Sequence, residues 1–125
     1  MTTGKPVVVQ QLPDVLDLDR AQEFFRTFEP HLDTDRPCFV FDFSRLRHLD
    51  SVGVDLLLRC MEETMKRNGD LKLAAVSPGL AAILEMTRID RLFEVYPNCN
   101  EAVASFHRFS TQVLDTSNGD RETVG

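Results

Sequence analysis

Several features that would mark particular protein classes are scarce or missing in this 125-residue sequence. It has no tryptophan, one tyrosine and only three cysteines, so a disulfide-rich scaffold is not indicated. No apolar run approaches the roughly 20 residues that a membrane helix needs. The N-terminus leads into only a short apolar stretch, which argues against a secretory signal. We therefore expect a cytoplasmic protein that does not insert into a membrane.

Positive charge is also in short supply. The chain has 14 Lys and Arg against 20 Asp and Glu, a formal net charge of −6. A polyanion such as nucleic acid, or an anionic membrane surface, would be repelled overall, and no run of Lys and Arg forms a local basic patch. The composition argues against those partners as the main ligand and is compatible with a protein partner.

Residues that bind metals are few and scattered. The three cysteines form no C-x-x-C pair, and no H-E-x-x-H pattern is present. We expect three reduced thiols used as small apolar residues, and neither a metal site nor a cofactor. The residues concerned are Cys38, Cys60, Cys99, His31, His48 and His107.

What the sequence does contain is an alternation of strand and helix patterns, with 42% hydrophobic and 27% charged residues. β-Branched and continuously apolar runs predict strands, and apolar residues at helical spacing predict helices. Asp17 or Asp19, and Ser77 before Pro78, are suitable N-caps, and Asn68-Gly69 is a suitable helix stop. The expected strands are 6–11, 38–43, 71–76 and 92–96, with an additional short strand at 15–16; the expected helices run to about 29, from 52 to 67, from 78 to about 88 and from 101 to about 109.

Strands separated by helices of this length predict crossover connections and an α/β fold with a parallel or mixed sheet. We expect one domain over residues 1–110 and a flexible C-terminal tail over residues 111–125, which is polar and lacks periodicity. The predicted buried faces of the first three helices are Ala21, Phe24, Phe25 and Phe28; Val54, Leu57, Leu58, Met61 and Met65; and Leu80, Ile83, Leu84 and Met86.

The most informative segment joins the buried strand at 38–43 to the second helix. In it Asp50-Ser51-Val52-Gly53 stands where the helix begins, so Ser51 lies among free backbone N–H groups and the positive end of the helix dipole. On spacing alone, Asp50 or Ser51 is simply an N-cap that stabilises the helix by about 1 kcal/mol. The functional alternative is that Ser51 is an exposed hydroxyl available for phosphorylation, which would add a charge of about −1.5 to −2.

The stretch from Phe39 to Phe106 resembles the STAS domain, and more narrowly the bacterial anti-sigma factor antagonists. The resemblance is carried by Asp42-Phe43-Ser44 at a strand end, by Leu49-Asp50-Ser51-Val52-Gly53 at a helix start, and by Leu84 to Phe93. It implies a single STAS-like domain with a small mixed sheet and helices packed mainly on one face.

The resemblance also implies a function. In that family the serine after the aspartate is phosphorylated by the partner, an anti-sigma serine kinase with a histidine-kinase-like ATPase fold, and a serine phosphatase resets it. Carried over to this chain, it makes Ser51 the phospho-acceptor on a partner-binding surface, and it makes the protein a substrate and binding partner rather than an enzyme. That surface comprises Asp50, Ser51, Val52, Gly53 and Asp55.

The chain departs from the family pattern at three places. Val52 stands where many relatives have a second serine, and Arg88 stands where many have glycine. The segment 12–17 is an imperfect match to the family's opening signal.

Two other functions are alternatives to this one. A STAS scaffold or transport-associated module would leave Ser51 unmodified. An enzyme with Ser51 as nucleophile would need a base such as His48 and an orienting group, and no G-x-S-x-G elbow is present.

Overall fold

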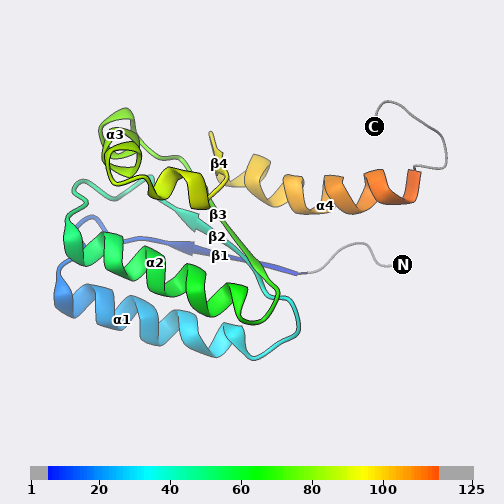
Figure 1. The fold of residues 1–125 in the computed structure, drawn as a ribbon, viewed down its shortest axis with the longest axis horizontal. Helices are drawn as coiled ribbons and strands as arrows, with labels where there is room; N and C mark the ends of the chain where they lie inside the picture. Colours follow the sequence, from blue (N-terminus) through cyan, green and yellow to red (C-terminus); the bar gives the residue numbers. More distant parts are fainter. Residues whose placement is uncertain (1–5, 116–125) are drawn as a thin grey trace.

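The protein is a four-stranded sheet with helices on both faces (Figure 1). The computed structural model describes the backbone of residues 6–115 and the side chains of residues 6–107. In chain order, with η marking short 3-10 helices, the elements are β1 (Val7–Gln11), α1 (Leu18–Phe28), η1 (Glu29–Leu32), β2 (Cys38–Asp42), α2 (Ser51–Met65), β3 (Asp70–Ala74), α3 (Pro78–Met86), η2 (Ile89–Leu92), β4 (Val95–Tyr96) and α4 (Cys99–Asp115).

The strands lie in the order β1-β2-β3-β4, and each neighbouring pair is parallel. Phe39 of β2 pairs with Val8 on one side and Leu71 on the other. The predicted α/β fold is confirmed. The resemblance implied a mixed sheet with helices mainly on one face, but the described residues form a parallel sheet with α1 and α2 on one face and α4 on the other. Because all strands point the same way, their carboxyl ends meet at one edge, where the predicted site lies.

Strand β2 is buried on both sides, as its continuously apolar sequence predicts. Phe39 and Phe41 face α1 and α2, whereas Val40 faces α4. The ring of Phe28 lies 4.5 Å from that of Phe39, and Phe24 meets Phe41 edge-to-face at 5.0 Å between ring centroids. Aromatic pairs of this kind contribute about 0.5–1.5 kcal/mol each beyond the area they bury.

Helices α1 and α2 lie side by side on one face of the sheet (Figure 1). The predicted buried face of α1 is confirmed, and Asp17, rather than Asp19, caps the helix by accepting a hydrogen bond from the Arg20 N–H. Phe25 is buried as well, because the Arg59 guanidinium of α2 stacks 3.9 Å from its ring centroid.

Helix α4 covers the opposite face of the sheet and packs on it through a small second core. A buried lysine of β3 also bonds to this helix. Lys72 of β3 is only 7% exposed, and its Nζ donates to Ser105 Oγ at 2.7 Å and pairs with Glu94 at 3.2 Å. The ammonium also lies 4.1 Å from the centroid of the Phe106 ring. Hydrogen bonds from the Tyr96 hydroxyl and then from Lys72 hold the pKa of Glu94 below its usual value.

Three predicted boundaries are wrong. Residues 15–16 form no strand: Leu16 is buried under α2, and the Asp14 carbonyl accepts a hydrogen bond from Arg47 N–H in the loop before that helix. Leu92 ends η2 instead of beginning a strand. The last helix continues to Asp115 rather than ending near Phe109, and the rest of the predicted tail, 116–125, lies outside the described residues.

The predicted buried faces of α2 and α3 are partly wrong. Met65 is 55% exposed and Met86 is 80% exposed. Compared with the predicted orientation, α2 is rotated about its own axis. Its fully buried residues, of which only Leu57 was predicted, are Gly53, Leu56, Leu57, Cys60 and Thr64. The rotation follows from the neighbours of α2, since Leu56 and Leu57 pack into the same cluster as the residues of α1 and β3.

Helix α2 is followed by two residues, Asn68 and Gly69, that are required for different reasons. Asn68, with φ of 59°, is the residue that takes the left-handed conformation, whereas Gly69 does not have a positive φ. Gly69 is instead required by a close approach, because a Cβ atom there would overlap the Pro37 carbonyl oxygen, which accepts a hydrogen bond from Asp70 N–H. The helix stop and the pairing of β3 with β2 therefore depend on the same glycine.

We predict opposite effects for two glycine substitutions. Gly69→Ala should lower the free energy of unfolding by about 2 kcal/mol or more. The added Cβ would overlap the carbonyl oxygen and the ring of Pro37, and these atoms cannot shift without moving the backbone. Gly79→Ala is the matched control: a Cβ there meets nothing within 4 Å, and alanine in helix α3 should add about 0.5–1 kcal/mol. Urea denaturation measures both, and equal effects would contradict the proposed contact.

Candidate functional site

The loop between β2 and α2 is held rigidly at the carboxyl edge of the sheet. Leu46 and Leu49 are buried in the core, so the loop is anchored from inside. Backbone hydrogen bonds tie the start of the loop down, with Phe43 N–H donating to the Ala74 carbonyl and Leu46 N–H to the Phe43 carbonyl. The beginning of α2 is thereby presented to solvent from a fixed base.

Asp50 is the N-cap of α2, one of the two residues, Asp50 and Ser51, that the simpler sequence interpretation allowed. Its backbone is extended, and its Oδ1 accepts hydrogen bonds from Val52 N–H at 3.0 Å and from Gly53 N–H at 3.4 Å. Its carbonyl accepts the first helical bond, from Val54 N–H at 2.9 Å. The carboxylate accepts hydrogen bonds from two of the otherwise free N–H groups at the helix end. It therefore stabilises the helix independently of any function of the site.

Ser51 is the first residue of α2 and is exposed. Its hydroxyl makes no hydrogen bond to any residue that the structure describes, so its Oγ is accessible to a reagent or a partner. The cap and the acceptor are thus different residues: Asp50 stabilises the helix end and leaves the serine side chain outside it.

Gly53 is buried, so it supports the site from below. A Cβ there would lie 2.6 Å from Leu49 Cδ1 and 3.2 Å from Leu16 Cδ2, which shows how closely the loops pack on the first turn of α2. Val52 is half-buried against the core, and Asp55 is exposed one turn after Ser51. Of the five predicted site residues, Asp50, Ser51 and Asp55 therefore reach solvent most fully.

The charges around Ser51 have both signs. Asp50 and Asp55 oppose a phosphate there, while the exposed Arg47, four residues earlier in the preceding loop, and the N-terminus of α2 favour it. His48 forms no hydrogen bond with Ser51 among the described contacts. The arrangement offers an accessible hydroxyl whose modification would change the charge of an exposed surface.

The sequence did not predict two exposed apolar side chains at this edge. Val15 lies in the loop that packs on Gly53, and Leu18 begins α1; they are 36% and 60% exposed. Leu18 fits the helical spacing of the buried residues of α1 but is the first residue of that helix and is exposed.

The cysteines are all free, and none lies in this site. Burial raises the pKa of the Cys60 thiol to about 12, so it remains protonated and acts as a small apolar group. The Cys99 thiol has a raised pKa because it is desolvated and lies near Asp42. No three His, Cys, Asp or Glu side chains among residues 6–107 are grouped so that they could hold a metal ion.

Comparison with known families places this geometry in a context. The family model for the STAS domain matches residues 2–102. No curated protein matches the chain significantly. Within the described part of the chain, no helix has the length and apolar character needed to cross a bilayer.

Solved structures with the same fold come from two kinds of protein. A putative anti-sigma factor antagonist from Thermotoga maritima matches with a TM-score of 0.71 and 20% identity, covering 80% of this chain and 86% of that one. An anti-sigma-factor antagonist (STAS) domain protein from Planctomyces limnophilus gives 0.69 and 20%, covering 78% and 88%. The STAS domain of a SulP transporter from Vibrio cholerae gives 0.67 and 16%, covering 90% and 88%.

The cap geometry makes a prediction about stability. Asp50→Ala should lower the free energy of unfolding by about 1 kcal/mol, because Val52 and Gly53 lose their acceptor, whereas Asp50→Asn should cost less than about 0.5 kcal/mol. Chemical denaturation followed by circular dichroism measures both. An alanine variant as stable as the parent would mean that water replaces the cap without loss.

Proposed function

Because this chain belongs to the STAS domain family, we propose that it is an anti-sigma factor antagonist that binds an anti-sigma serine kinase when unphosphorylated and is released when Ser51 is phosphorylated. The observation that carries the proposal is the exposed Ser51 hydroxyl at the start of α2, free of internal hydrogen bonds and set beside the Asp50 cap. In this scheme the protein is a substrate and a binding partner, and a serine phosphatase resets it.

A phosphate on Ser51 needs no refolding to act as a switch. It would add a charge of about −1.5 to −2 on a surface that already carries Asp50 and Asp55. A partner that contacts this surface would then meet extra negative charge that has to be desolvated, which weakens the contact. Since Val52 is half-buried and carries no hydroxyl, Ser51 is the acceptor in this motif.

A second candidate function rests on the likeness to the transporter STAS domain of Vibrio cholerae, which covers 90% of this chain. In that case the chain would serve as a regulatory or assembly module, and Ser51 would stay unmodified. The two functions differ in one measurable property, which is whether Ser51 carries phosphate.

We predict a single phosphate on the peptide that contains Ser51 when the protein is isolated from its native cells. Mass spectrometry of the digested protein would detect it, and the Ser51→Ala variant expressed in the same cells is the matched control. Phosphate that persists on the variant would assign the modification to another residue, and a parent protein without phosphate under any growth condition would favour the transporter-type module.

We also predict that Ser51→Ala binds the kinase persistently and that Ser51→Asp binds it weakly. Because a single aspartate carries less charge than phosphate, the loss of affinity should be smaller than the loss on phosphorylation, about tenfold or 1.4 kcal/mol. A pull-down from native cells with both variants as bait compares the kinase retained, identified by its ATPase domain. Equal retention of the kinase by the two variants would contradict the switch.

A further inference from the structure

The two edges of the sheet are protected to different degrees. With the strand order β1-β2-β3-β4, the edge strands are β4 and β1. Strand β4 is only two residues long and stands between Glu94 and Pro97, and short length, charge and proline are features by which proteins prevent an edge from pairing with another chain. Strand β1 has five residues, Val7–Gln11, and contains no charge, proline or glycine. Of the two edges, β1 is therefore the one that is open to pairing.

The main chain of β1 has hydrogen-bonding groups on its outer side that the described residues leave unused. The Leu12 N–H donates to the Asp42 carbonyl of β2, and every second residue before Leu12 points the same way. Since alternate residues of a strand direct their N–H and C=O groups to opposite sides, those of Val7, Val9 and Gln11 point away from β2. Nothing in the described part of the chain bonds to them. These groups are a template for a further strand.

The side chains of β1 also suit pairing with a further strand. Three of the five residues are valines, whose branched side chains favour strands. Val9 is 46% exposed and lies on the face of the sheet that carries α4, next to the partly buried Val7. A strand beside β1 would cover this valine as well as bond to the main chain.

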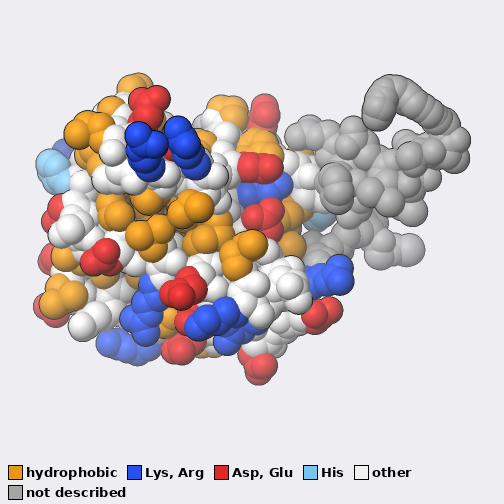
Figure 2. Space-filling view, in the orientation of Figure 1, with side chains coloured by type: hydrophobic (Ala, Val, Ile, Leu, Met, Phe, Trp, Pro, Cys, Tyr) orange, Lys and Arg blue, Asp and Glu red, His pale blue; other side chains and the backbone are white. Residues whose placement is uncertain are grey.

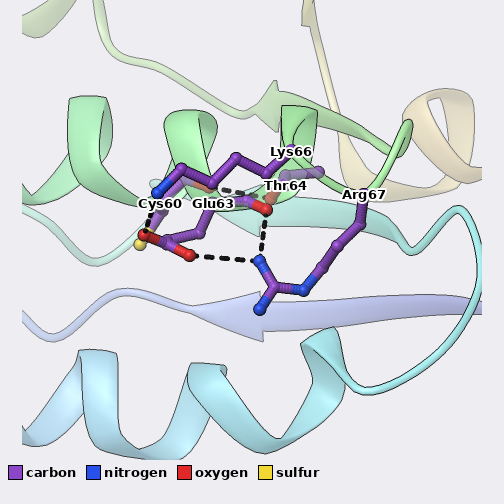
Figure 3. Close-up of polar contacts among 5 residues, drawn as sticks. All are labelled: Cys60, Glu63, Thr64, Lys66 and Arg67. Carbon is purple, nitrogen blue, oxygen red and sulfur yellow. Dashed lines mark hydrogen bonds and ion pairs between the residues drawn. The ribbon is translucent and has the colours of Figure 1, made fainter.

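The polar groups at the C-terminal end of α2 offer a contrast, because they bond to one another. Glu63 pairs with Lys66 at 3.2 Å and with Arg67 at 3.1 Å, and Thr64 Oγ1 donates to the Cys60 carbonyl at 2.8 Å (Figure 3). The hydrogen bonds from Arg67 and then from Lys66 lower the pKa of Glu63. The outer groups of β1 have no comparable partners among the described residues.

A second copy of β1 is complementary to the first when the two strands run antiparallel. In the register centred on Val9, each Val9 faces the other Val9, and each Val7 faces Gln11. The outward-pointing residues of the two copies are then opposite each other, and each such pair exchanges two hydrogen bonds. At the intervening positions Val8 faces Gln10, so no charged residue faces another.

We propose that two copies of this chain form a dimer by pairing β1 with β1 in this antiparallel register, so that the two sheets join into one. The second copy fits the edge because it has the same length, the same neutral sequence and the same flanking prolines, Pro6 and Pro13, which end the pairing on both sides. A contact in which a surface meets its own copy about a two-fold axis closes after two chains. The edges that remain in the dimer are the two β4 strands, which are the protected ones.

Charge neither selects another partner nor opposes this one. In Figure 2, Lys and Arg side chains lie next to Asp and Glu side chains over α1 and α2, so that face has no patch of one sign. The hollows beside the two ends of β1 are also lined by charges of both signs: Asp33, Asp35 and Arg36 at the amino end, and Arg20, Glu23 and Arg45 at the carboxyl end. Recognition at this edge therefore rests on the main chain and the valines.

Sedimentation velocity of the full chain between about 1 and 300 µM measures the dimer. We expect a species of twice the 14.2 kDa mass of one chain, and its fraction should rise with concentration. Val9→Lys should weaken the dimer at least about tenfold, because it sets two ammonium groups opposite each other. Val95→Lys is the matched control: Val95 is also 46% exposed but lies on β4, so this change should alter dimerisation less than about twofold.

A mixture of two oppositely charged variants tests the register. Val9→Glu should weaken the dimer as Val9→Lys does, since two carboxylates then face each other. Mixed in equal amounts, the two variants should form a heterodimer at least about tenfold more tightly than either variant pairs with itself, because lysine then faces glutamate. This gain is specific to a contact in which position 9 meets position 9.

Hydrogen exchange of the parent protein gives a test that needs no variant. In the dimer the amide protons of Val7 and Gln11 are bonded across the interface, so their exchange should slow as the concentration rises. The amide protons of Val8 and Gln10 point toward β2 and should be protected at every concentration. Ser51→Asp should leave this pattern and the dimer unchanged, because Ser51 lies on α2 and not on β1.

Four outcomes would overturn the proposal: a parent protein that stays monomeric up to about 300 µM, a dimer that Val9→Lys leaves intact, oppositely charged variants that do not associate, or outer amides of β1 whose exchange is independent of concentration. A monomeric parent would leave the edge to a strand of a different protein or to solvent. The result is separate from the phosphate test, since a monomeric protein can still carry phosphate on Ser51, and an unmodified Ser51 leaves the dimer intact.

Discussion

The double burial of strand β2 is the constraint on which the rest of the structure depends. Phe39 and Phe41 pack against the aromatic face of α1, and Val40 packs against α4. The strand is therefore fixed by apolar contacts on both faces of the sheet. Its carboxyl end delivers the loop that leads to α2, and Leu46 and Leu49 keep this loop in the core. The position of Ser51 is therefore set by apolar packing some distance from it, which gives the exposed hydroxyl a fixed place on the surface.

At the start of α2, stability and function are divided between adjacent residues. Asp50 satisfies the free N–H groups of the helix end, and Gly53 allows Leu16 and Leu49 to pack against the first turn. Ser51, between them, has no structural role that its side chain must fulfil. A residue without such a role can be modified without unfolding the domain, and this separation is what a phosphorylation switch requires.

Helix α2 has one fully buried apolar face and, next to it, apolar residues that are only partly buried. Leu57 and its buried neighbours hold the helix on the sheet, while Val54, Leu58 and Met61 beside them are only partly buried and Met65 is exposed. On the other face of the sheet, by contrast, the buried Lys72 is fully engaged by Ser105, Glu94 and Phe106, so that contact stabilises the docking of α4 and offers nothing to a partner.

The order of strands and helices, the buried face of α1, the central position of β2 and the capping aspartate of α2 all follow from the sequence. Each depends on local patterns: the β-branched and aromatic runs, the helical spacing of Phe24, Phe25 and Phe28, and an aspartate placed before a helix. The place of Ser51 at the helix start is local too, and for that reason the predicted site residues lie together in the fold.

Only the tertiary structure decided which apolar stripe of α2 is buried. Periodicity showed that Val54, Leu58, Met61 and Met65 share a face, but it carries no information about the direction from which other elements approach. The need for glycine at position 69 is likewise not visible in the sequence. Glycine is required there because Pro37, which is far away in the sequence, lies too close for a Cβ atom. Local patterns determine the elements and their caps, whereas the rotation of each helix is settled by the surfaces available to pack against it.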